Sequence, residues 1–177
     1  RYCASLARTS PGGSDMSQSD FVARFGGIYE HSPWVAERAA QHLGTSMDFD
    51  QIAALMADCV DNASYEQQLE LIRAHPDLAG RAQVAGELTE ASTEEQSSAG
   101  LDQCSTEEYE RFQSLNDAYK KKFGFPFVMA VRNSSRSEIL EEFARRLEND
   151  PALEFETALV EIHKIARMRL EAIGLAQ

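Results

Sequence analysis

A histidine followed by a proline is the first feature of this sequence that suggests chemistry. His75 comes at the end of an expected helix, and Pro76 fixes the backbone after it, so the imidazole is held at a rigid corner. Histidine, with an ordinary pKa of about 6.5, can donate and accept protons near neutral pH. The pattern is typical of a general acid or base, although a histidine that compensates a helix dipole would look the same.

A short polar stretch is the second candidate for a site. It comprises Ser92, Thr93, Glu94, Glu95 and Gln96. Ser92 and Glu95 have the spacing of a capping box, in which each side chain binds the other residue's backbone amide at a helix start. A helix start with these side chains also offers hydrogen-bond donors and acceptors to a small polar ligand. The two interpretations do not exclude each other.

The third candidate is an apolar segment that contains a proline. Pro126 disfavours a helix here, so the sequence predicts a short stretch of buried extended chain. The amides from residue 127 onward are then available to a neighbouring segment or to a planar, amide-like ligand. The residues concerned are Phe127, Val128, Met129, Ala130 and Val131.

An arginine on the apolar side of the last expected helix is the fourth candidate. The buried stripe of that helix is expected to contain Leu159, Ile162, Ile165, Ala166 and Ile173. Arg169 lies on the same stripe, and a buried arginine needs an anionic partner, either a protein carboxylate or a ligand carboxylate. His163 falls on the polar side of this helix, where we expect an ordinary surface residue.

Helix start and stop signals position these candidates. The expected starts are Ser32-Pro33, Asp48, Ser64, Ser92, Ser105, Ser135 or Ser137, and Asp150-Pro151, and the expected ends include Gly44, Gly124 and Gly174. Because strand patterns and repeats are missing from the sequence, we predict an all-α fold, a single compact bundle of about seven or eight helices. This domain is expected to span residues 21–177, after a flexible leader or cloning remnant at residues 1–20.

Composition excludes several classes of function. The formal net charge is -12, from 17 basic and 29 acidic residues, which argues against nucleic acid or an anionic membrane as the main partner. An apolar stretch of the roughly 20 residues that a membrane helix needs is absent from the sequence. The 3 cysteines, without a CxxC pair, indicate reduced thiols in a cytosolic type of compartment. The histidines lack metal-binding spacings, so we expect no metal site.

Three motifs occur in this order along the chain: HPDLAG at residues 75–80, EQSSAGL at residues 95–101 and FGFPFV at residues 123–128. Together they resemble a known family, the 2-oxo-4-hydroxy-4-carboxy-5-ureidoimidazoline (OHCU) decarboxylases of urate degradation. Weaker matches include FGGIYE at residues 25–30 and Arg169 with Leu170. The resemblance extends over residues 21–173.

This resemblance implies an all-α, homodimeric enzyme that decarboxylates OHCU, a small anionic substrate, to S-(+)-allantoin without a cofactor. It implies that His75 is the catalytic proton donor, Glu95 its partner carboxylate and Arg169 an arginine that faces the pocket. Pro76 and the residues at 92–96 and 127–131 would contact the substrate.

The resemblance is compatible with a cytoplasmic location, or with a peroxisome in a eukaryote, although Leu175-Ala176-Gln177 is not a Ser-Lys-Leu-type signal. A non-catalytic helical domain that binds a partner is the alternative.

Overall fold

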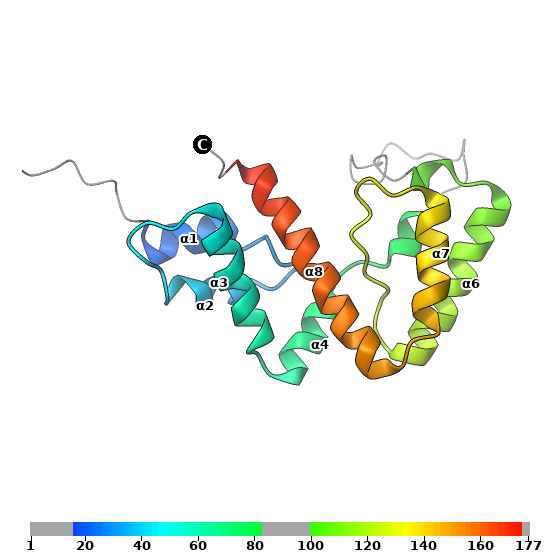
Figure 1. Ribbon diagram of the computed structural model, residues 1–177, viewed down its shortest axis with the longest axis horizontal. Coiled ribbons are helices and arrows are strands. Elements are labelled where there is room, and N and C mark those ends of the chain that lie inside the picture. The colour runs from blue at the N-terminus through cyan, green and yellow to red at the C-terminus, as the bar shows by residue number, and fades with distance from the viewer. Residues whose placement is uncertain (1–15, 83–99, 175–177) are drawn as a thin grey trace, which may run out of the picture.

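The computed structural model describes residues 16–82 and 100–174, and this part of the chain is helical (Figure 1). It contains seven α-helices and no β-strand, which confirms the all-α prediction. The helices are α1 (Gln18–Phe25), α2 (Trp34–Ala40), α3 (Phe49–Asp61), α4 (Tyr65–Ala74), α6 (Thr106–Phe123), α7 (Arg136–Leu147) and α8 (Pro151–Ile173). Two 3-10 helices, η1 (Leu78–Arg81) and η2 (Leu101–Gln103), complete the regular structure of the described residues.

Local capping explains where most of these helices begin and end. Capping boxes at Asp48, Ser64 and Ser105 start α3, α4 and α6, as the sequence predicts. Serine and aspartate side chains also cap α7 and α8. Gly124 and Gly174 end α6 and α8 with left-handed φ angles of 74° and 82°, which glycine adopts without strain.

Two helix starts differ from the expectation. Pro33 precedes α2 without a side-chain cap, because the Ser32 hydroxyl donates to the Glu30 carbonyl oxygen at 2.9 Å instead. Helix α1 begins at Gln18, capped by Ser17, so the helical part of the chain starts before the expected boundary at Phe21. The expected capping box of Ser92 lies outside the described residues.

Helix α8 is the central element of the arrangement. It crosses the molecule diagonally in Figure 1, with α1, α2 and α3 on one side of it and α6 and α7 on the other. It contacts α3, α4 and α6. No helix in the described ranges is long and apolar enough to cross a membrane.

A fully buried ion pair joins α7 to α8. Arg146 and Glu154 both have side-chain exposures of 0%, and Arg146 Nε donates to Glu154 Oε1 at 2.7 Å. Glu154 also accepts hydrogen bonds from the Tyr119 hydroxyl at 2.5 Å and from the Asn149 amide at 3.1 Å. Burial, and then the bond to Glu154, raise the pKa of Tyr119, so its hydroxyl stays a donor.

The same arginine holds the segment that follows α6. Its Nη1 donates to the Val128 carbonyl oxygen at 2.7 Å, and its guanidinium lies over the Phe127 ring, 4.4 Å from the centroid. The Phe127 ring in turn stacks on Phe143, with 3.9 Å between the ring centroids. Residues 125–128 are buried and not helical, which agrees with the prediction of buried, non-helical chain.

We expect Arg146→Met to lower the free energy of unfolding by about 3–5 kcal/mol, because it leaves the Glu154 carboxylate buried without a counter-charge. The neighbouring Arg145 is a matched control, since its side chain is 63% exposed and pairs with Glu142 at the surface. Arg145→Met should change stability by less than about 1 kcal/mol. Urea unfolding of both variants measures the difference, and equal losses would contradict this account of the core.

Candidate active site

His75 forms the corner between α4 and the following segment. It is the C-cap residue of α4, with an extended ψ of 138° ahead of Pro76, and only 6% of it is exposed. Its Nδ1 lies 3.0 Å from the Leu71 carbonyl oxygen. Because a carbonyl only accepts, Nδ1 carries a hydrogen, and Nε2 is the nitrogen that gains or loses a proton. The imidazole therefore satisfies a helix-end carbonyl through Nδ1.

The segment after His75 is fastened to α6. Gln113 Nε2 donates to the Ala79 carbonyl oxygen at 2.9 Å, and Lys120 Nζ pairs with Asp77 at 3.0 Å. Leu78 and Ala79 are buried between these contacts. The position of the His75 backbone is thus set from both sides, by α4 and by α6.

Arg169 has a protein carboxylate as its partner. Its Nη2 lies 2.5 Å from Glu30 Oε2, and its Nη1 donates to the Ile28 carbonyl oxygen at 3.2 Å. The two side chains of the pair are 24% and 23% exposed, so both reach a surface that solvent touches. A guanidinium has five N–H groups, and those not used in these two bonds donate to no other described residue.

The sequence reasoning did not identify Glu30 as the partner of Arg169, although Glu30 ends the FGGIYE motif. Burial by itself would raise its pKa, but the hydrogen bond and charge of Arg169, with smaller contributions from His75 and His31, lower the pKa overall. Glu30 is therefore a carboxylate near neutral pH, and it lies within electrostatic reach of both Arg169 and His75.

The segment at residues 127–131 offers backbone donors. Phe127 and Val128 are buried, whereas Met129, Ala130 and Val131 are half-buried. The Val128 carbonyl is occupied by Arg146, but no amide of the five donates to another residue within 16–82 or 100–174. That these amides bind a ligand stays a prediction.

Contacts at both ends bring this segment toward the two side chains above. On the N-terminal side of the segment, Arg73 Nε donates to the Gly124 carbonyl oxygen at 3.2 Å. Arg73 lies on α4, two residues before His75. After the segment, Arg132 pairs with Glu171 on α8 at 3.6 Å, two residues from Arg169. The predicted site residues at 92–96, Glu95 among them, lie outside the described residues.

The prediction for His163 was wrong. His163 is not an ordinary surface residue, because its Nε2 bonds to Asp61 at 2.9 Å and its Nδ1 to the buried Tyr29 hydroxyl at 2.8 Å. Helical periodicity identified its face but not its partners in other elements. The expected buried stripe of α8 also ends early, since Ile173 is 39% exposed.

Comparisons with known proteins find similar sequences. A family model described as OHCU decarboxylase matches residues 14–171. The 2-oxo-4-hydroxy-4-carboxy-5-ureidoimidazoline decarboxylase of Haloferax volcanii is 48% identical over 155 residues, which cover 88% of this chain and 89% of that protein. The mouse protein of the same name is 39% identical over 157 residues, 89% of this chain and 88% of that protein.

Two solved structures are also similar. The crystal structure of an (S)-allantoin synthase has a TM-score of 0.70 and 38% identity, covering 88% of this chain and 50% of that one. The crystal structure of an OHCU decarboxylase in the presence of (S)-allantoin has a TM-score of 0.66 and 25% identity, covering 82% and 93% of the two chains.

The lowered pKa of Glu30 makes its contribution to stability depend on pH. A carboxyl group whose pKa is lower in the folded state stabilises the fold above its unfolded pKa, and this contribution is lost as the pH falls through the folded value. Glu30→Gln should therefore destabilise the protein most near neutral pH, and the difference should shrink as the pH falls below the ordinary value of 4.5. Urea unfolding from pH 7 down to pH 3 tests this, and a difference that grows on acidification would disprove it.

Proposed function

We propose that this chain, which belongs to the OHCU decarboxylase family, converts OHCU to (S)-allantoin in urate degradation. The match over residues 14–171 carries this conclusion, because it includes His75, Arg169 and the segment at 127–131. Relatives that are similar over most of their own length are named for the decarboxylation, and the two similar structures are described by the product.

The reaction breaks one carbon–carbon bond and makes one carbon–hydrogen bond. The substrate's carboxylate leaves as carbon dioxide, and the electron pair of the broken bond stays on the ring, where the adjacent carbonyl and imine groups delocalise it. A proton then adds to a ring carbon. Because the substrate's own ring delocalises the electron pair, the protein has three tasks. It must orient the substrate, stabilise the developing negative charge and deliver the proton to one face of the ring carbon.

The residues of the site divide these tasks. Arg169 binds the anionic group with the N–H groups that Glu30 and Ile28 leave unused. The amides at residues 127–131, together with Pro76 and residues 92–96, hold the oxygens and edges of the ring and ureido groups. His75 exchanges the proton through Nε2, since Nδ1 is committed to Leu71, and Glu95 polarises the imidazole.

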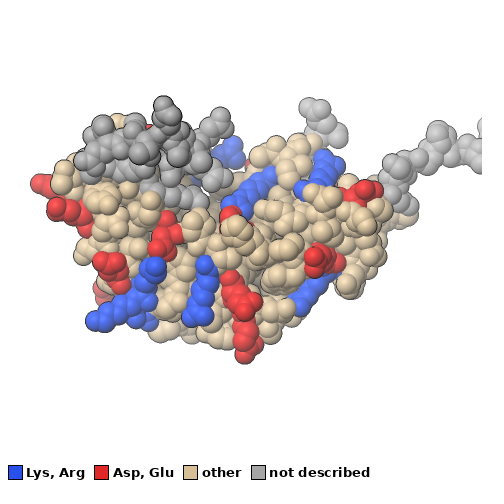
Figure 2. All heavy atoms as spheres, turned by 180° about the vertical axis from the view of Figure 1, so that it is seen from behind, with Lys and Arg blue, Asp and Glu red and all other residues tan. Residues whose placement is uncertain are grey.

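Binding of an anion by an acidic protein requires local attraction. On the face shown in Figure 2, basic and acidic side chains alternate, and neither sign forms a continuous patch over the described residues. With a net charge of -12, long-range steering would repel the substrate. The attraction therefore comes from Arg169 and from backbone donors in a partly buried site, where screening by salt is weak.

The decisive experiment measures which enantiomer of allantoin is formed. OHCU generated in place from urate, by urate oxidase and hydroxyisourate hydrolase, decays slowly to racemic allantoin. With the protein present, we expect rapid formation of the S enantiomer, followed by circular dichroism. Slow racemic product, unchanged by the protein, would refute the proposed function and favour a domain that only binds a partner.

His75→Asn should lower kcat by at least about 100-fold, because general acid–base catalysis contributes roughly 10²–10⁴ in rate. Asparagine keeps a donor that can reach the Leu71 carbonyl, so the thermal transition should move little. His42→Asn, at an exposed histidine outside the site, is the matched control and should keep full activity. Near wild-type turnover by a folded His75→Asn protein would remove His75 from the mechanism.

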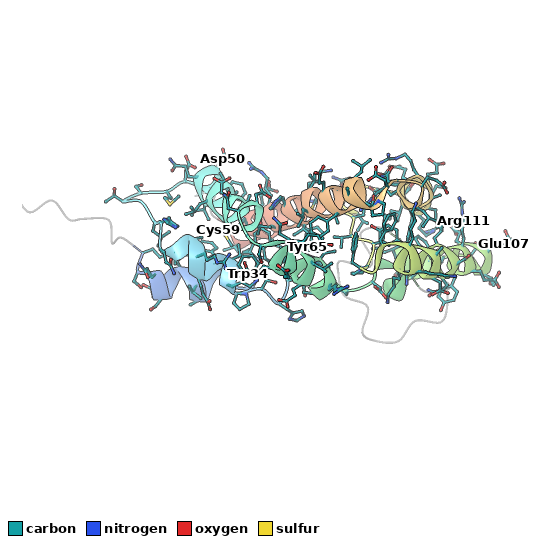
Figure 3. The ribbon with its side chains drawn as sticks, turned by 90° about the horizontal axis from the view of Figure 1, so that it is seen from below. Trp34, Asp50, Cys59, Tyr65, Glu107 and Arg111 are labelled. Atoms are coloured by element: carbon teal, nitrogen blue, oxygen red, sulfur yellow. The ribbon has the colours of Figure 1, made fainter. Side chains whose placement is uncertain are left out.

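We also propose that the protein is a homodimer in the cytoplasm. Leu153 and Val160 lie two helical turns apart on α8 and are 46% and 52% exposed, which supports a partner on this face. Tyr65 of α4, labelled in Figure 3, is 61% exposed and stacks on Phe155 of α8, with 4.9 Å between ring centroids. The free thiol of Cys59 supports a reducing compartment.

Val160→Glu should shift the protein from dimer to monomer in sedimentation velocity runs, because it replaces an exposed apolar side chain with a charge that is costly to bury. Met16→Glu, at an apolar residue that is 37% exposed far from α8 in the sequence, is the control. A wild-type protein that sediments as a monomer, or a Val160→Glu variant that stays dimeric, would contradict this placement of the interface.

A further inference from the structure

The backbone between α1 and α2 is unusual at the residue after Glu30. His31 has a φ of 46°, in the left-handed region that residues other than glycine seldom adopt. Its side chain is 79% exposed, whereas the side chain of Glu30 is turned inward and is 23% exposed. Strained backbone persists where the surrounding structure enforces it, which is often at functional sites. The strain here accompanies the inward placement of one carboxylate.

We propose that Glu30 is a positioning residue for the reaction: it fixes the guanidinium of Arg169 in the orientation that binds the anionic substrate. This inference rests on the proposed function and deepens it. Glu30 itself does not touch the reacting atoms. Its effect passes through Arg169, whose side chain would otherwise turn about several single bonds.

Two contacts on one segment define that orientation. Nη2 of Arg169 meets the Glu30 carboxylate at 2.5 Å, and Nη1 meets the Ile28 carbonyl at 3.2 Å. A planar guanidinium held at both terminal nitrogens cannot rotate in its plane, so the direction of its other N–H groups is set before substrate arrives. Such preorganisation raises the rate because orientation is not paid for at each turnover.

The segment that carries Glu30 is itself braced against other helices. The Tyr29 hydroxyl bonds to His163 on α8, and His163 bonds to Asp61 on α3. Because the carboxylate accepts from Nε2, neutral His163 has Nδ1 as an acceptor for the tyrosine hydroxyl. Two neighbouring residues thus attach the segment to α8. Tyr29 bonds to His163, which has no proposed role in the reaction, whereas Glu30 bonds to Arg169, which is proposed to bind the substrate.

The two contacts distinguish a residue that orients Arg169 from one that only stabilises the segment. Glu30→Ala should lower kcat/KM for OHCU at least tenfold. Glu30→Gln, which keeps an acceptor for Arg169, should recover most of that loss. His163→Ala, which loosens the same segment without touching the carboxylate, should keep activity within about threefold of wild type even where it lowers the melting temperature, since such support affects stability more than orientation.

Two further variants complete the test. Asp50 pairs with Arg167 of α8, two residues before Arg169, so Asp50→Ala removes a comparable partner outside the site and should leave turnover unchanged. In a background of Arg169→Ala, adding Glu30→Ala should cause no further loss, because the two residues act as a unit.

Each outcome has a definite meaning. An inactive wild-type protein would refute the proposed function itself. With an active wild type, the positioning role is overturned if Glu30→Ala is as active as wild type, if Glu30→Gln is as impaired as Glu30→Ala, or if His163→Ala loses as much activity as Glu30→Ala. Full additivity of Glu30→Ala and Arg169→Ala would also overturn it.

Discussion

The buried pair of Arg146 and Glu154 is the interaction on which the rest of this structure depends. Two charges removed from water are unfavourable unless hydrogen bonds offset the loss, and here Tyr119 donates to Glu154 while Arg146 donates to the Val128 carbonyl. These partners belong to α6, α7, α8 and the segment after α6. One desolvated ion pair therefore fixes the relative positions of three helices and of the segment after α6.

Arg169 and Glu30 form a second arginine–carboxylate pair, which lies nearer to solvent. Arg146 is fully buried and holds the segment's carbonyl, whereas Arg169 is partly exposed and keeps N–H groups for a ligand. In both pairs a carboxylate orients the guanidinium. An acidic protein can in this way present positive charge to an anion at one point while its overall charge stays strongly negative.

Local signals in the sequence were enough to predict most of the helices. The capping boxes at Ser64 and Ser105 and the glycine at 124 act within one turn, so their residues carry the information themselves. Family motifs then predicted His75 and Arg169 as site residues. The long-range partners could not be predicted: Glu30 and Arg169 are 139 residues apart, because helical periodicity specifies a face and not what meets it.

The central claim is that the amides at residues 127–131 and the guanidinium of Arg169 together form the ligand site, and a titration with product followed by ¹H–¹⁵N NMR tests it most directly. On addition of (S)-allantoin, we expect the amide signals of residues 127–131 and the Nε–H signal of Arg169 to move in a saturable way. (R)-allantoin at the same concentrations should move them less. If these signals stay fixed while those of another surface move, the site is elsewhere and the account is wrong.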